Sequence, residues 1–261
     1  MSDVSDWWRT SIIEMEPGKI AFRGHSIESL IGNVSFPQMI WLMLRGDLPS
    51  KPQAYLLEAA LVAAVDHGPQ APSIAAARMA VTCGLPLNNA LGTAVNMLGD
   101  VHGGAGEQAV ELYHAIHQAG GVDYAATEID RWQSERTVFV PGFGHRFHKP
   151  VDPRAPRLLA LVDEAKEAGV VEGYFANIGR AIEAELLARK GKPVPMNIDG
   201  ATAVIYAELG FAPPLARGLF CLSRSVGVLA HAWEQQQQGG RNKGPTPPNY
   251  RWTYDGEQRS E

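Results

Sequence analysis

Apolar residues recur at three- and four-residue spacing along most of the chain, which is the pattern of helices with one buried face. The first clear run extends from Leu56 to Ala64, and the prolines between Pro49 and Pro52 mark where that helix starts. We therefore predict a mainly α protein. The further runs with this spacing cover 91–98, 110–116, 158–162, 174–189, 200–209 and 214–234.

The two ends of the chain have different patterns. Two short apolar stretches between Ile12 and Ile27 flank the turn pair Pro17-Gly18, which predicts a short β-hairpin. From Gly239 to Tyr254, Pro, Gly and Arg interrupt the apolar periodicity, so we expect an extended arm. A length of 261 residues fits either one large core or two lobes.

Composition narrows the class of protein. Hydrophobic residues make up 45% and charged residues 20%, as in ordinary globular proteins. A net charge of -5 offers no general attraction for nucleic acid or anionic membranes, so we expect neither as a partner. The chain has two distant cysteines, Cys83 and Cys221, and no export pattern at its N-terminus, which predicts free thiols and a cytoplasmic location.

A first candidate for chemistry is Val101-His102-Gly103-Gly104, which lies between two predicted helices. Glycines let backbone approach a ligand closely, and an imidazole there can donate to a developing oxyanion. The alternative is a histidine at a helix-to-helix turn, with the glycines serving as caps.

The second candidate is the stretch Val140-Pro141-Gly142-Phe143-Gly144-His145-Arg146-Phe147-His148-Lys149, followed by Asp152-Pro153-Arg154. Glycines, histidines and cations at this density suit the binding of phosphates and carboxylates. A solvated basic loop is the alternative.

Three further residues are candidates with structural alternatives. Asp199, in Asn197-Ile198-Asp199-Gly200, is either a helix N-cap or a general base. Arg224 lies in an apolar helical run and needs an anion, either a substrate carboxylate or a structural acid. His67 is either a cation at a helix C-terminus or a substrate contact.

Several classes of site are excluded by motif. The pairs His114 with His117 and His145 with His148 have no third ligand at metal spacing, so we predict surface or core histidines and no metal. Walker A, dinucleotide-binding and Gly-x-Ser-x-Gly patterns do not occur, which argues against ATP hydrolysis, hydride transfer and serine-esterase chemistry.

In this order the motifs resemble the citrate synthase superfamily, from Gly18 to about Glu234. The likeness includes Arg45-Gly46-Asp47-Leu48-Pro49 and, most specifically, Gly142-x-Gly144-His145-Arg146 with Asp152-Pro153-Arg154-Ala155. The resemblance implies a homodimer of mostly α chains, each with a large domain (1–101 and 210–261) and a small domain (102–209). It implies coenzyme A and acetyl-CoA as substrates, a 2-oxo or citrate-like acid, and no tightly bound cofactor.

The same resemblance assigns roles to the candidates. His102 would hold the thioester oxygen, Asp199 would remove a methyl proton, and His145 would polarise the carbonyl of the second substrate. His67, Arg154 and Arg224 would bind that acid. Coenzyme A would contact Val140, Pro141, Gly142, Phe143 and Gly144 through its adenine, and Arg146 or Lys149 through its phosphates.

Some features favour the citryl-CoA lyase branch. The chain is short, Asp66-His67-Gly68-Pro69 replaces the synthases' Asp-His-Glu, and Asn-Ile-Asp-Gly replaces their Asn-Val-Asp-Phe. His102 instead matches the synthases. Gly244-Pro245 replaces an Arg-Pro of many synthases, with Arg241, Lys243 or Arg251 as substitutes. Citrate synthase, a relative using another 2-oxo acid, and a non-catalytic acyl-CoA-binding protein remain as alternatives.

Overall fold

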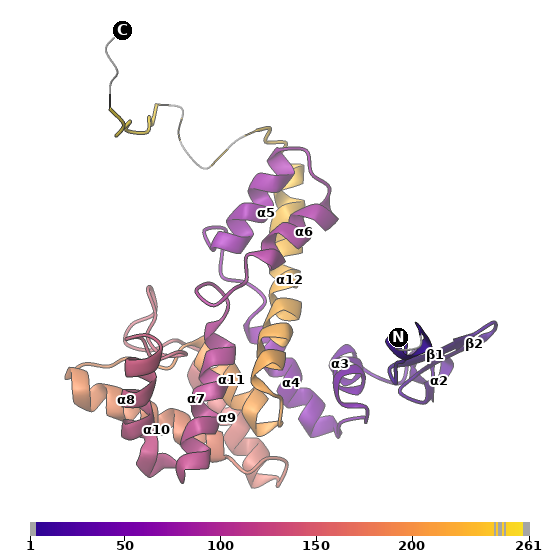
Figure 1. Ribbon diagram of the computed structural model, residues 1–261, viewed down its shortest axis with the longest axis horizontal. Helices are drawn as coiled ribbons and strands as arrows, with labels where there is room; N and C mark the ends of the chain where they lie inside the picture. The colour runs from indigo at the N-terminus through magenta and orange to yellow at the C-terminus, as the bar shows by residue number, and fades with distance from the viewer. Residues whose placement is uncertain (1–3, 243, 245–246, 248, 258–261) are drawn as a thin grey trace. The chain divides into compact units, whose positions relative to one another are not determined.

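Helices account for most of the regular structure, as the periodicity predicts (Figure 1). The computed structural model describes residues 4–242, 244, 247 and 249–257. The helices are α1 (Val4–Trp7), α2 (Ile27–Leu30), α3 (Phe36–Arg45), α4 (Lys51–Ala63), α5 (Pro72–Thr82), α6 (Leu87–Asn96), α7 (Ala105–Ala119), η1 (Val122–Tyr124), α8 (Ala125–Glu135), α9 (Arg154–Glu167), α10 (Tyr174–Lys190), α11 (Ile198–Glu208) and α12 (Pro213–Gln237).

The predicted hairpin is present at the N-terminus. Strands β1 (Ile13–Glu16) and β2 (Lys19–Phe22) pair antiparallel around Pro17 and Gly18, and Gly18 has a φ of 79°. A third short strand, β3 (His25–Ser26), pairs with β2 and completes a sheet of order β1-β2-β3. The prediction is confirmed and extended by one strand.

Helices α3 and α4 begin at capping serines and first-turn prolines. Helix α4 begins at Lys51, and its N-cap Ser50 forms a capping box with Gln53. The same arrangement of Ser35 and Gln38 starts α3. The prolines that marked the start of α4 in the sequence therefore mark it in the structure, because proline fits the first turn of a helix.

The chain divides into two compact units. Unit 1 comprises Met1–Ala64 and Gly103–Ser223, and unit 2 comprises Val65–His102 and Arg224–Glu261. The large and small domains expected from the resemblance have other boundaries and remain a prediction.

Helix α11 forms the centre of unit 1. Its residues from Gly200 to Ala207 are all buried, because small and branched apolar side chains occupy every face of the helix. It packs against α4, α7, α9 and α10. The start of α11 is therefore held on a rigid element.

Unit 2 has its own small core. Helices α5 and α6 pack closely on each other, beside the later part of α12 (Figure 1). The contact is made largely of alanines, which allow close approach of helices. The buried residues are Ala71, Ile74, Ala77, Ala80, Ala90, Ala94, Val228 and Ala232.

The predicted arm contains neither helix nor strand among its described residues, which are 239–242, 244, 247 and 249–254. A search of the described helices for one long and apolar enough to cross a membrane finds none.

Candidate active site

Unit 2 brings three of the predicted site residues together. His67 and Arg224 both lie within electrostatic range of His102, and Arg224 is only 4% exposed. Burial, the Arg224 guanidinium and His67, in that order of size, hold the pKa of His102 below its usual value. His102 is therefore a neutral imidazole at neutral pH.

The protonated nitrogen of His102 is fixed by helix α5. Ala71, the N-cap of α5, makes no side-chain hydrogen bond to the helix start, and the backbone N–H of Ser73 instead donates to Nε2 of His102 at 3.2 Å. The Ser73 hydroxyl is 3.0 Å from the same nitrogen. Because a backbone N–H can only donate, Nε2 accepts and the proton lies on Nδ1. His102 thus presents a neutral N–H donor, a group that can stabilise an oxyanion.

In unit 1, the glycine-rich loop packs onto the residues that precede α11. Gly142 and Gly144 have φ values of 84° and 81°, a conformation that favours glycine. The Gly142 carbonyl accepts from the Asn197 backbone at 2.9 Å, and Gly144 N–H donates to the Pro195 carbonyl at 2.7 Å. The glycine part of the stretch is thus tied to the segment before α11 by backbone hydrogen bonds.

His145 extends from this loop with a defined tautomer. Backbone N–H groups of Phe147 and His148 both donate to its Nδ1, at 3.0 and 2.9 Å. The neutral ring therefore carries its proton on Nε2. Like His102, His145 therefore has one ring nitrogen that acts as a hydrogen-bond donor, in this case Nε2.

Asp199 is not a helix cap. Asn197 is the N-cap of α11, and its Oδ1 accepts from the backbone of Asp199 at 2.9 Å and of Gly200 at 3.2 Å. The Asn197 Nδ2 also donates to the Gly144 carbonyl at 2.8 Å. One side chain thus couples the glycine-rich loop to the start of α11, and the N-cap is Asn197 rather than the half-buried Asp199.

Arg154 already has an anionic partner. Its Nε and Nη2 donate to the two carboxylate oxygens of Asp152 at 2.9 and 2.8 Å, and the Asp152 side chain is 0% exposed. Burial opposes ionisation of Asp152, but the hydrogen bonds from Arg154 outweigh it, and the pKa of Asp152 is lowered. The charge of His148 contributes to this shift, which places the pair close to the glycine-rich loop.

The remaining predicted residues differ in exposure. Val140 and Pro141 are buried, whereas Arg146 and Lys149 are exposed, with the Arg146 guanidinium 5.9 Å from the centre of the Phe147 ring. Arg241 and Arg251 are exposed on the C-terminal arm. Lys243 and Pro245 lie outside the described residues.

Ser73, Asn197 and Asp152 are not among the site residues predicted from the sequence. Two sequence features could have identified Asn197 and Asp152. Asn197 is an Asx residue before a predicted helix, and Asp152 is an acid two residues before an arginine. Ser73 had no such feature, because 29 residues separate it from His102. Fold geometry alone brings those two together.

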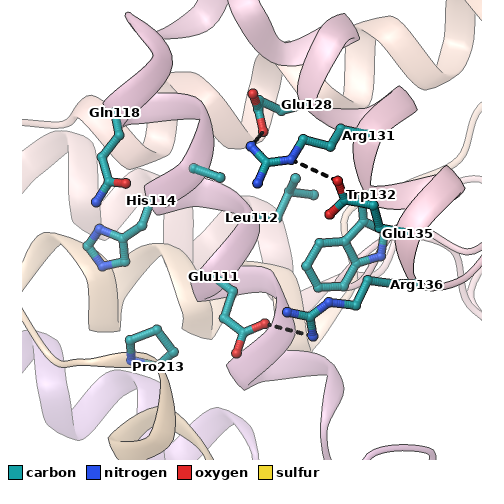
Figure 2. A pocket seen from close by; sticks show the side chains of 11 residues that line it. Glu111, Leu112, His114, Gln118, Glu128, Arg131, Trp132, Glu135, Arg136 and Pro213 are labelled. Carbon is teal, nitrogen blue, oxygen red and sulfur yellow. Dashed lines mark hydrogen bonds and ion pairs between the residues drawn. The ribbon is translucent and has the colours of Figure 1, made fainter.

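A separate cavity in unit 1 contains none of the predicted site residues. It has a volume of about 310 Å³ and lies between α7, α8 and the start of α12. Figure 2 shows that its charged groups are paired, Arg131 with Glu128 and Glu135, and Arg136 with Glu111. In the part of the chain that the structure describes, no group of three or more His, Cys, Asp or Glu is arranged to hold a metal.

Comparison with known proteins identifies the family. The model of the family described as citrate synthase, C-terminal domain, matches residues 51–245. The structure resembles citryl-CoA lyase from Hydrogenobacter thermophilus with a TM-score of 0.84 and 30% identity, over 97% of this chain and 96% of that one. ATP citrate lyase from Methanosaeta concilii, solved with (3S)-citryl-CoA, shares the fold at a TM-score of 0.79 and 19% identity, over 98% of this chain and 45% of its own.

Curated relatives are longer. Citrate synthase from Haloferax volcanii is 31% identical over 75% of this chain and 50% of its own length. The chain spans about half the length of the curated relatives it matches. The family match and the end-to-end likeness to a solved relative confirm the resemblance that the motifs indicated, and this chain belongs to the citrate synthase superfamily.

Proposed function

We propose that this protein is a citryl-CoA lyase, which cleaves citryl-CoA reversibly to acetyl-CoA and oxaloacetate. The observation that carries this choice is the structural likeness to the Hydrogenobacter thermophilus lyase, at a TM-score of 0.84 and 30% identity. The motif Asn197-Ile198-Asp199-Gly200, which departs from the synthases' Asn-Val-Asp-Phe, supports the same branch.

The reaction needs two hydrogen-bond donors and one acid–base group. Cleavage moves the electrons of the carbon–carbon bond into a thioester enolate, and it moves one proton from the tertiary hydroxyl oxygen to the methylene carbon. A donor must stabilise the enolate oxygen and another the oxygen that becomes the ketone. In the reverse direction a base removes the methyl proton of acetyl-CoA.

The two fixed histidine tautomers support these roles. We assign the Nδ1–H of His102 to the thioester oxygen and the Nε2–H of His145 to the hydroxyl or ketone oxygen. Both nitrogens are donors because the other nitrogen of each ring accepts from backbone N–H groups. Asp199 is assigned the proton transfer: on cleavage it takes up the hydroxyl proton, directly or through water, and delivers a proton to the methylene carbon. A half-buried carboxylate on a rigid helix start suits that task.

The remaining site residues are assigned to substrate binding. His67, Arg154 and Arg224 bind the carboxylates of the acid, and a buried arginine such as Arg224 is suited to pair with an anion. The loop Val140 to Gly144 contacts the adenine of coenzyme A. The exposed cations Arg146 and Lys149 meet its phosphates, and no tightly bound cofactor is required.

The deciding experiment is a mass-spectrometric assay of purified protein given citryl-CoA, with Asp199→Asn as control. Acetyl-CoA and oxaloacetate, absent with the variant, are the expected products. Citrate and free CoA would overturn the lyase assignment in favour of a citrate synthase. No turnover of citryl-CoA would overturn both.

Citrate synthase is the second candidate, because curated relatives at 31% identity carry that name. A relative that uses another 2-oxo acid, or a non-catalytic acyl-CoA-binding protein, follows if citryl-CoA is inert. Exchange of the methyl protons of acetyl-CoA with deuterated water, dependent on Asp199, separates those two. The homodimer, the cytoplasmic location and the contribution of the C-terminal arm also remain proposals.

A further inference from the structure

His231 lies between an acid and a base in unit 2. Its Nε2 is 3.1 Å from Oδ1 of Asp66, and its Nδ1 is 3.3 Å from Nη1 of Arg78. Arg78 in turn contacts Glu234 at 2.7 Å and donates to Gln238 at 3.0 Å. The side chains of His231 and Arg78 are both 19% exposed, so a chain of polar contacts runs from α5 through α12 to the turn after α4.

Arg78 determines which nitrogen of His231 carries the proton. A guanidinium has donors and no acceptor, so Nδ1 of His231 must accept. The proton of the neutral ring then lies on Nε2, which donates to Asp66. Glu234 is the other charged group near Nδ1, at 4.0 Å, and it is already engaged by Arg78.

The acceptor, Asp66, belongs to the turn that presents His67. Its Oδ2 accepts from the Gly68 backbone at 3.1 Å, which closes the turn around His67. The turn rests directly on α12, since a Cβ atom at Gly227 would lie 2.2 Å from the Val65 carbonyl oxygen. Gly227 comes between Arg224 and His231 along α12. The contacts of Asp66 therefore set where the turn with His67 stands relative to α12, the helix that contains Arg224.

We propose that His231 is a positioning residue of the active site: its Nε2–H, held in that tautomer by Arg78, fixes Asp66 and so holds the turn of His67 against α12, the helix that contains Arg224. The inference rests on the proposed function in so far as His67 and Arg224 bind the substrate acid. His231 itself does not contact substrate. Replacing it should impair turnover of citryl-CoA and leave the binding of CoA alone intact, because the proposed CoA contacts lie in unit 1.

Two substitutions distinguish the effect of the Nε2–H hydrogen bond from the effect of side-chain packing at position 231. His231→Leu removes the N–H, whereas His231→Gln keeps an N–H near the position of Nε2. We expect His231→Leu to lower kcat/KM for citryl-CoA about 100-fold and His231→Gln to recover to within about tenfold of the wild type, since misplacement of a binding group by about 1 Å has that effect. Gln236→Leu, at an exposed position of the same helix, is the matched control. Equal loss in the Leu and Gln variants, or a parallel loss of CoA affinity, would overturn the proposal.

Nitrogen-15 NMR of histidine-labelled protein tests the proposal without turnover. We expect wild-type His231 to be protonated on Nε2 alone, and the His67 resonances to shift in His231→Leu but not in His231→Gln. His25, in unit 1, serves as the reference. The opposite tautomer, or unchanged His67 resonances in His231→Leu, would overturn the positioning role. If the wild-type protein does not cleave citryl-CoA, the proposed function is overturned instead. The NMR comparison then still tests the positioning role of His231.

Discussion

The hydroxyl of Tyr206 lies within electrostatic reach of the Asp199 carboxylate, two turns earlier on the same helix, α11. Burial, reinforced by the Asp199 charge, raises the pKa of Tyr206 well above its usual value, so the phenol stays protonated. Among the described residues, the Tyr206 hydroxyl has no hydrogen-bond partner although the side chain is only 1% exposed.

Replacing Tyr206 with Phe should therefore not destabilise the protein. A buried donor without a partner costs about 1 kcal/mol or more, so we expect the free energy of unfolding to rise by about 1 kcal/mol in Tyr206→Phe. The matched control is Tyr113→Phe, because the equally buried Tyr113 hydroxyl donates to the Gly200 carbonyl at 3.2 Å. Its removal should lower stability by about 1 kcal/mol. Urea unfolding at neutral pH measures both, and a loss in Tyr206→Phe would show that its hydroxyl is paired in the native protein.

The lowered pKa of His102 predicts a pH dependence of stability. The folded state binds a proton at His102 less readily than the unfolded state, whose imidazole titrates near 6.5. Between the folded pKa and 6.5 the unfolded chain thus carries more protons, and stability rises with pH in that window. His114, also lowered by burial and by His117, acts in the same direction.

Substitution isolates the His102 contribution. In His102→Asn the free energy of unfolding should depend less steeply on pH just below 6.5, because a histidine with a lowered pKa is gone. His114→Asn should flatten the curve similarly, and the double variant should flatten it further. An identical slope in wild type and His102→Asn would mean that its pKa is not lowered in the folded state.

The apolar periodicity predicted many of the helices, but it did not single out α3 or α8, although both contain large apolar side chains. The runs ending at Ala64 and beginning near 158 correspond to α4 and α9. Helix α5 was not picked out, because its sequence, Pro-Ser-Ile-Ala-Ala-Ala-Arg-Met-Ala-Val-Thr, buries mainly alanines and small residues that give a weak period. The same small residues are what allow α5 and α6 to pack closely.

Candidate site residues within short motifs could also be predicted from the sequence. Contacts between residues far apart in the sequence could not. The loop around His145 and the Asn197-Ile198-Asp199 start of α11 can each be recognised from a motif of a few consecutive residues. The contacts of His102 with Ser73 and of His231 with Asp66 join residues far apart in sequence, and no periodicity or spacing encodes them. The roles of these residues in catalysis remain predictions.

The ion pair of Arg154 and Asp152 predicts an asymmetric response to mutation. In Arg154→Met the buried Asp152 carboxylate loses two hydrogen bonds and its counter-charge, and we expect a loss of about 3 kcal/mol. The double variant Asp152→Asn with Arg154→Met removes the charge as well and should recover part of that loss. Chemical unfolding of the two single variants and the double variant tests this, and a double variant less stable than Arg154→Met would contradict it.

The same pair gives a prediction at acid pH. The folded pKa of Asp152 lies below the unfolded value of 3.8, so its stabilisation is present above that value and is lost as pH falls through the folded pKa. Asp152→Asn should therefore be less sensitive to acid than the wild type below about pH 4. Unfolding free energies measured from pH 5 downward give the comparison, with parallel curves as the contradicting result.

The contact between Gly142 and Gly200 predicts how the glycine-rich loop depends on α11. A Cβ atom at Gly200 would lie 2.4 Å from the Gly142 carbonyl oxygen and 2.9 Å from Cγ of Met196. Gly200→Ala must therefore displace the loop, at a cost of about 1–3 kcal/mol in stability. If the loop binds coenzyme A, affinity for CoA should fall about tenfold or more, since the loop no longer holds its bound geometry.

Gly92→Ala provides the matched control for this change. Gly92 lies in the interior of α6, where a Cβ atom meets nothing within 4 Å, so alanine should stabilise the protein by about 0.5–1 kcal/mol and leave CoA affinity unchanged. Calorimetric titration with CoA and thermal unfolding measure both variants. Unchanged stability in Gly200→Ala would show that the loop and α11 separate freely. Lost stability with unchanged CoA affinity would instead remove the loop from the coenzyme A site, because the same displaced backbone is proposed to contact the adenine.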